Sequence, residues 1–139
     1  MRTLIVAAGV IIGQNGILVT QRKEDVPHGL LWEFPGGKVE EGEEARQALR
    51  RELKEELDIE VEVGMIFDAV FHFYPDHPVL LLVYHCRVDK GVLKPLGCRA
   101  FRWVDPKGLK ELAMPAADES IRNRLGSESF FYGPGVNLR

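Results

Sequence analysis

The chain has 139 residues and a formal net charge of −3, from 18 basic and 21 acidic side chains. This length fits one domain with a single core and leaves no room for a second domain of ordinary size. Hydrophobic residues make up 45% and charged residues 28%, which excludes a disordered, collagen-like or coiled-coil chain. The slight acidic excess argues against a partner such as duplex nucleic acid, whose binders normally carry a basic face.

The cysteines and the apolar runs bear on where the protein resides. Cys86 and Cys98 are the only cysteines, and their spacing fits neither a CxxC pair nor a zinc cluster. We interpret both as reduced core thiols of a cytoplasmic protein. Outside the N-terminus the longest apolar run is 79–84, far below the roughly 18 residues that a membrane span requires. No small-residue cleavage site follows the apolar stretch 4–12, so we expect neither a signal peptide nor a membrane partner.

The first elements are two apolar, β-branched runs, residues 4–12 and 17–22, separated by Gln14-Asn15-Gly16. This pattern predicts an N-terminal β-hairpin. Residues 24–37 are expected to form a loop, because prolines and glycines interrupt any regular pattern there. The interrupting residues are Pro27, Gly29, Pro35, Gly36 and Gly37.

The rest of the chain alternates between helical and extended patterns. Apolar residues at spacings of three and four predict a helix over residues 43–57. The further expected elements are strands at 61–74, 79–88 and 100–104 and short helices at 106–112 and 116–125. This order indicates a mixed α/β (α+β) sandwich, a sheet with helices on its faces. We expect one domain over residues 1–126 and a loosely ordered tail over 127–139.

Three glutamates of the long helix are the first candidate functional residues. Glu52, Glu55 and Glu56 lie at positions i, i+3 and i+4, so they share one face of the helix. Like charges at this spacing destabilise an isolated helix by a few tenths of a kcal/mol each. Clustered carboxylates suit a hard divalent cation such as Mg²⁺, although a glutamate-rich helix is often only a solvated surface. The three residues alone leave both interpretations open.

The segment 37–59 as a whole resembles the signature of the Nudix hydrolases. Asp58 departs from that pattern, because the family usually has glycine there; aspartate tolerates the left-handed conformation of a helix end, so we expect only a modest local cost. The matching positions are Gly37, Glu43, Arg51, Glu52, Leu53, Glu55, Glu56 and Ile59.

The resemblance extends over residues 3–125 and is strongest to the MutT branch of that family. Residues 29–38, Trp103-Val104 and 115–118 match further landmarks of this branch. The resemblance implies the Nudix fold, a mixed sheet sandwiched between helices, with the signature forming a loop, a helix and a loop. It also implies hydrolysis of a nucleoside triphosphate to a nucleoside monophosphate and pyrophosphate, with Mg²⁺ as cofactor and Mn²⁺ as an alternative.

The same resemblance implies roles for the signature residues. Glu52, Glu55, Glu56 and the Gly36 carbonyl would hold the metal ions, and one of the three glutamates would activate water; which one stays open. Glu43 would support this shell, and Arg51 would orient a glutamate through a charge-assisted hydrogen bond.

Five residues are candidates for contacts with the substrate. Arg22 and Lys38 could bind phosphate, although Arg22 could equally be a solvated strand end. Gly37 suits close approach of the backbone to a ligand. Phe34 is the best candidate for stacking on a base. Asp118 matches a base-contacting asparagine of MutT-like enzymes, with a helix cap as the alternative role.

These interpretations predict a Mg²⁺-dependent enzyme that clears oxidised nucleotides such as 8-oxo-dGTP, a form of DNA repair by sanitation of the nucleotide pool. A pyrimidine triphosphate (CTP) pyrophosphohydrolase and a non-catalytic Nudix-fold nucleotide sensor are the alternatives. The sequence leaves open whether the protein is a monomer or a homodimer. Gly97 stands where MutT-like enzymes often have a glutamate, so we expect weaker binding of an additional Mg²⁺, or a substitute carboxylate from Glu33 or Asp76.

Overall fold

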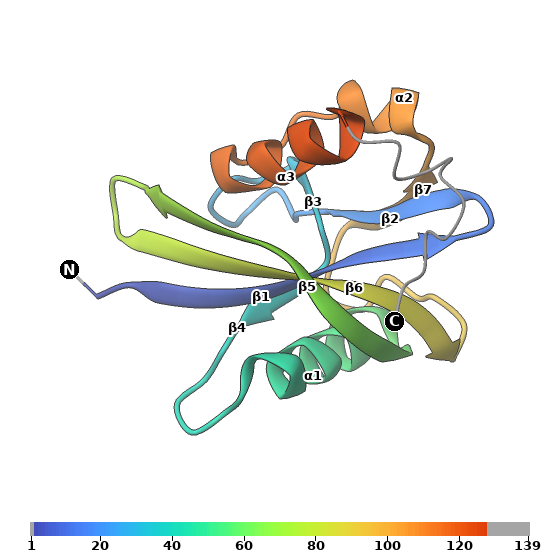
Figure 1. The fold of residues 1–139 in the computed structure, drawn as a ribbon, viewed down its shortest axis with the longest axis horizontal. Coiled ribbons are helices and arrows are strands. Elements are labelled where there is room, and N and C mark those ends of the chain that lie inside the picture. The colour runs from blue at the N-terminus through green and yellow to red at the C-terminus, as the bar shows by residue number, and fades with distance from the viewer. Residues whose placement is uncertain (1, 128–139) are drawn as a thin grey trace.

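The strand on which the sheet is built is β1 (Leu4–Gly13). It runs parallel to β6 (Pro78–Lys90) and antiparallel to β4 (Gly36–Lys38), and its last residues turn into β2 (Gly16–Gln21). The computed structural model describes residues 2–127 (Figure 1). Its other elements are β3 (Trp32–Glu33), α1 (Ala45–Leu57), β5 (Glu60–Phe73), β7 (Ala100–Val104), α2 (Pro106–Lys110) and α3 (Ala116–Ser127).

The strands form a sheet in the order β3-β2-β1-β6-β5, with β4 paired to β1 and β7 paired to β2. The predicted hairpin is present but short, because β1 and β2 pair only at Ile12↔Ile17 and Gly13↔Gly16. Before that point β1 pairs with β6 from Leu4 to Ile11. A parallel pair needs a long crossover connection, and the local pattern of β1 could not reveal that partner.

Helices cover both faces of the sheet: α1 lies on one side, and α2 and α3 lie on the other (Figure 1). Strand β1 shows why, since Ala7 and Ile11 belong to the core under α1, whereas Ala8 and Val10 belong to the core under α2 and α3. A strand buried on both faces reads as a continuous apolar run. The expected α/β sandwich is confirmed.

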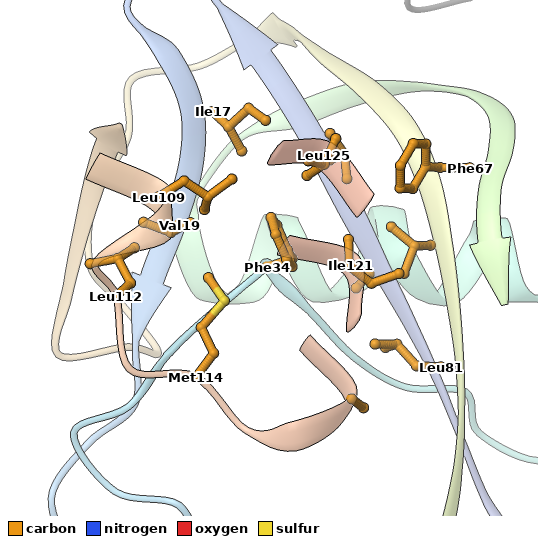
Figure 2. Packing of buried hydrophobic residues seen from close by; sticks show 14 of the residues in the cluster. Ile17, Val19, Phe34, Phe67, Leu81, Leu109, Leu112, Met114, Ile121 and Leu125 are labelled. Carbon is orange, nitrogen blue, oxygen red and sulfur yellow. The ribbon is translucent and has the colours of Figure 1, made fainter. Parts of the chain in front are cut away.

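The core under α3 includes the ring of Phe34, which lies among the side chains of Met114, Ile121 and Val19 (Figure 2). Phe34 is only 2% exposed. The expectation that this ring stacks on a base is therefore corrected. Residues 32–33 and 36–38, expected as loop, form the short strands β3 and β4 because β2 and β1 supply their partners.

Helix α1 has well-defined ends. Glu44 is the N-cap and forms a capping box with Gln47. Asp58 is the C-cap in the left-handed conformation (φ 58°), as expected, and its N–H donates to the Lys54 carbonyl at 3.1 Å. The Asp58 carboxylate lies 3.1 Å from Lys54 Nζ and 3.6 Å from Lys94 Nζ. These ion pairs partly offset the cost of a non-glycine residue at this position.

The expected cysteine state is confirmed, because Cys86 and Cys98 are both buried free thiols. Burial raises the pKa of Cys86 to about 12 and is the main reason that the pKa of Cys98 rises to about 11. Within residues 2–127, no helix has the length and apolar character needed to cross a membrane. The expected tail lies outside the described residues, apart from Ser127, with which α3 ends.

Candidate active site

Arg51 organises the start of the candidate site by binding three parts of the signature segment. Its Nε and Nη2 donate to the Glu43 carboxylate at 2.7 and 2.9 Å, and Nη2 also donates to the Lys38 carbonyl at 3.0 Å. Its Nη1 donates to Glu52 at 3.0 Å and to Glu55 at 3.4 Å. Hydrogen bonds from Arg51 are the main reason that the pKa of Glu43 lies below its usual value. The loop before α1 is thus fastened to the helix by a single guanidinium.

Glu52 packs directly on the backbone of Gly37. A Cβ atom at position 37 would overlap the Glu52 carboxylate and lie 2.6 Å from its Oε1. The side chain of Glu52 is only 16% exposed, and burial raises its pKa. Because Gly37 has no side chain, the Glu52 carboxylate can occupy the space beside β4. Any other residue at position 37 would fill that space.

Glu56 lies deeper in the same acidic cluster. Burial, together with the charges of Glu33 and Glu52, raises its pKa to about 8. Gly97 lies against it, since a Cβ at position 97 would be 3.0 Å from Glu56 Cγ and 3.2 Å from Glu56 Cα. The N–H of Gly97 also donates to the Glu56 carbonyl at 3.0 Å. Position 97 therefore borders the cluster, and only backbone lies where MutT-like enzymes often have a glutamate.

Of the two substitutes considered for that carboxylate, Glu33 lies beside Glu56. Burial raises the pKa of Glu33 above its usual value, and Arg22 partly offsets this. Asp76 lies instead in the exposed turn between β5 and β6.

The acidic cluster carries carboxylate oxygens, which are the kind of ligand that a divalent cation such as Mg²⁺ takes. Glu52 and Glu56 bring carboxyl groups together, and burial, then the charges of Glu33 and Glu52, raises the pKa of Glu56. Glu55 is 60% exposed at its side chain and bound to Arg51. Within the described part of the chain, no three acidic, histidine or cysteine side chains are placed together closely enough to hold one ion. The hard oxygen donors of these glutamates are of the type that Mg²⁺ prefers.

Arg22 and Lys38 differ in how free they are. The Arg22 Nη1 donates to both Glu33 oxygens, at 3.1 and 3.3 Å, and its Nε donates to the Pro27 carbonyl at 2.7 Å. Lys38 is exposed and uses its carbonyl, not its ammonium, to bind Arg51. Arg22 is thus a held side chain beside the acidic cluster, not a solvated strand end.

Asp118 joins α3 to the segment that leads into the signature. Its Oδ2 accepts from the Phe34 N–H at 3.1 Å, and the residue is 8% exposed. Burial, then the charge of Glu33, raises its pKa to about 7. This contact is not an N-cap, because Asp118 accepts from the N–H of Phe34, which lies outside α3.

Tyr74 is a neighbour of this site that sequence patterns did not indicate. Its hydroxyl accepts from the Ala117 N–H at 2.9 Å, in the same turn of α3 as Asp118. Its ring packs against His72 and His28, with ring centroids 4.4 and 5.1 Å away. Tyr74 ends an expected strand, and no local signal links it to a helix that follows so much later in the chain.

The geometry of α1 and its preceding loop agrees with a comparison against known families. The model of the NUDIX domain matches residues 3–125. This chain belongs to the Nudix family. Its described Nudix helix, α1, carries Glu52, Glu55 and Glu56, while Gly37 lies in β4 and Glu43 in the loop between β4 and α1. The Nudix membership and the fold expected from the resemblance are confirmed.

Individual relatives place this Nudix hydrolase in the MutT-like branch. The 8-oxo-dGTP diphosphatase of Proteus vulgaris is 43% identical over 81 residues, which cover 58% of this chain and 72% of that protein. The CTP pyrophosphohydrolase of Escherichia coli (strain K12) is 35% identical over 118 residues, covering 85% and 87%. The solution structure of the E. coli ORF135 protein gives a TM-score of 0.80 at 31% identity, covering 97% of this chain and 96% of that one.

Proposed function

We propose that this Nudix hydrolase cleaves nucleoside triphosphates to a nucleoside monophosphate and pyrophosphate in a Mg²⁺-dependent reaction, with 8-oxo-dGTP as the leading substrate. The observation that carries the proposal is the network of Arg51, which holds Glu43, Glu52 and Glu55 around the start of α1. Such a network supports phosphoryl transfer, in which a protein mainly positions groups and balances charge. We place the activity in the cytoplasm, where buried thiols such as Cys98 stay reduced.

The metal ligands in this proposal are Glu52, Glu55, Glu56 and the carbonyl of Gly36, with Mn²⁺ as an alternative ion. A cation held by these residues would supply positive charge to offset that of the substrate phosphates. Glu33 is the substitute for the carboxylate missing at Gly97, because its charge already acts on Glu56.

The other residues position the substrate and the water. Arg51 keeps Glu52 in place, and one of Glu52, Glu55 or Glu56 accepts the proton of the water that attacks phosphorus. This attack breaks the P–O bond that joins the α- and β-phosphates, so the products are the nucleoside monophosphate and pyrophosphate. Lys38 and the held Arg22 are the phosphate contacts in this proposal, and Gly37 lets the backbone approach them.

Asp118 is the proposed base-selecting residue. Burial raises the pKa of Asp118 to about 7, so its carboxylate is fully ionised only above that pH. In that form it only accepts hydrogen bonds and favours base edges that carry N–H groups, such as guanine, 8-oxoguanine or the amino group of cytosine. Leaving a buried acceptor unpaired costs about 1–3 kcal/mol, so a base without the donor should lose roughly five- to a hundred-fold in efficiency.

The test is pyrophosphate release from a panel of 8-oxo-dGTP, dGTP and CTP, with Mg²⁺ present or chelated. We expect 8-oxo-dGTP to have the highest kcat/KM and chelation to abolish release. Asp118→Asn and Asp118→Ala should change the ratios among the three substrates, whereas the neighbouring Glu119→Gln should not. Ratios unchanged in both Asp118 variants would return this residue to a structural role.

CTP is the second candidate substrate, and the similarity to the E. coli CTP pyrophosphohydrolase favours it. A higher kcat/KM for CTP than for 8-oxo-dGTP would replace the leading substrate while leaving the reaction intact. Tight nucleotide binding with no pyrophosphate release from any substrate would favour the sensor alternative.

A further inference from the structure

Strand β5 forms one edge of the sheet, next to β6 (Figure 1). Its pairing with β6 is irregular near Glu60, between Val63 and Ile66, and between Ile66 and Asp68. From Asp68 to Phe73 the register is regular. The last part of β5 is therefore a regularly paired stretch of edge strand.

Two features indicate which backbone groups of this edge face outward. The N–H of Ala69 donates to Asp68 Oδ1 at 2.8 Å, and Pro78, which lies opposite Phe73, has no N–H to donate. In an antiparallel ladder, alternate residues bond the partner strand, and the residues between them point their N–H and C=O groups the other way. The backbone groups of Ala69, Phe71 and Phe73 therefore point away from β6.

The same stretch exposes two large apolar side chains. Phe71 is 49% and Phe73 is 75% exposed, and their rings meet edge to face with centroids 4.8 Å apart. Ile5, 41% exposed, continues this surface across the sheet, because Ile5 and Phe71 both pair with Leu80.

Within residues 2–127, and apart from the Asp68 carboxylate bound to the Ala69 N–H, this stretch lacks the features by which exposed edges usually avoid association. Natural edge strands carry lysine, proline, inward-pointing charge or a bulge. Residues 69–73 read Ala-Val-Phe-His-Phe, and the bulges of β5 all precede them. An unprotected edge with an apolar face is a surface for another strand.

We propose that this chain self-associates through residues 69–73 of β5, paired antiparallel with the same segment of a second copy. Antiparallel self-pairing has two-fold symmetry, so Phe71 lies opposite Phe71 of the second copy, and Ala69 lies opposite its Phe73. Each copy then supplies partners for the outward backbone groups of Phe71 and Phe73 in the other, the Ala69 N–H exchanges Asp68 Oδ1 for a carbonyl of the second copy, and four phenylalanine rings cover one another. No charged residues oppose each other within the paired stretch, which favours a second copy as the occupant.

The proposal is independent of the hydrolase activity and is tested by sedimentation of the full chain over a range of concentrations. An interface this short belongs to the weak class, so we expect a dimer with a Kd on the order of 10–100 μM. Phe71→Lys and Phe73→Lys should each raise that Kd at least about tenfold, a change of about 1.4 kcal/mol. Val92→Lys is the matched control, since Val92 is 77% exposed but lies outside the sheet edge.

Amide hydrogen exchange of the unmodified protein supplies a second measurement that does not depend on the variants folding. The amides of Phe71 and Phe73 should exchange rapidly in dilute protein and become protected as the concentration rises. A monomer at every concentration, a dimer that survives both lysine variants or is lost in Val92→Lys, or a dimer that leaves these amides unprotected would each overturn the proposal.

Discussion

The carboxylate of Glu52 lies where the side chain of any residue other than glycine at position 37 would begin. The two residues belong to different elements, β4 and α1, and the Arg51 guanidinium holds the same carboxylate at 3.0 Å. The position of Glu52 is thus set jointly by a glycine and an arginine. This relationship gives a first prediction about the site.

Gly37→Ala should displace Glu52 and lower kcat/KM about 100-fold, because small misplacements of a reacting group are costly. We expect the free energy of unfolding to fall by about 1–3 kcal/mol through overpacking. Gly42→Ala, in the loop between β4 and α1, is the control: its Cβ meets open space, but its φ of +78° should cost about 1 kcal/mol. Steady-state kinetics and urea unfolding of both variants provide the test, and full turnover by Gly37→Ala would contradict the prediction.

Glu55→Gln and Glu56→Gln should each lower hydrolysis by about 10²–10⁴-fold while the fold survives. Glu56→Gln also removes a carboxyl group whose pKa is raised to about 8. The free energy of unfolding of this variant near neutral pH should therefore be unchanged or higher. Glu111→Gln, at the exposed C-cap of α2, should leave both quantities unchanged. Kinetics with thermal unfolding separates the alternatives: an unfolded variant would make these glutamates structural, and an active one would remove them from catalysis.

Gly97→Glu should change the dependence of activity on Mg²⁺, because a side chain at this position begins 3.0 Å from Glu56 Cγ. The added carboxylate should lower the Mg²⁺ concentration needed for half-maximal activity. Gly97→Gln has nearly the same shape without the charge and separates the electrostatic effect from crowding of Glu56. If the glutamate and glutamine variants give the same Mg²⁺ curve, the charge at position 97 has no role.

The buried carboxyl of Asp118 should make stability depend on pH. Its pKa rises from an ordinary value of 3.8 to about 7 in the folded protein. Between those values the folded state keeps a proton that the unfolded state releases, so the free energy of unfolding falls as pH rises, by about 1.4 kcal/mol per pH unit for this group. Below and above this window its contribution is flat.

Asp118→Asn lacks this titration and keeps an oxygen that can accept from the Phe34 N–H. Its stability relative to the unmodified protein should therefore increase between pH 4 and pH 8, by about 4 kcal/mol at most. Urea unfolding of both proteins across this range measures the difference, to which Glu33 and Glu56 contribute little because both proteins retain them. A difference that does not change with pH would show that Asp118 stays ionised throughout.

The sequence by itself determined the local elements and the chemical character of the signature. The spacing of Leu49, Leu53 and Leu57 predicted α1, and the short range of helical hydrogen bonds explains why such a period suffices. It also placed Glu52, Glu55 and Glu56 on one helix and anticipated the left-handed end at Asp58.

Only the tertiary structure decided which of these residues lie in contact, and how burial and neighbouring charges shift the pKa values of their carboxyl groups. The contact of Phe34 with Asp118 joins residues 84 positions apart, and it turned an expected stacking residue into a buried ring whose N–H holds a carboxylate. Glu33 affects Glu56 only because β3 pairs with β2 and thereby reaches α1's acidic face. Long-range pairing and burial depend on the whole chain at once, whereas periodicity and capping are properties of a few neighbouring residues.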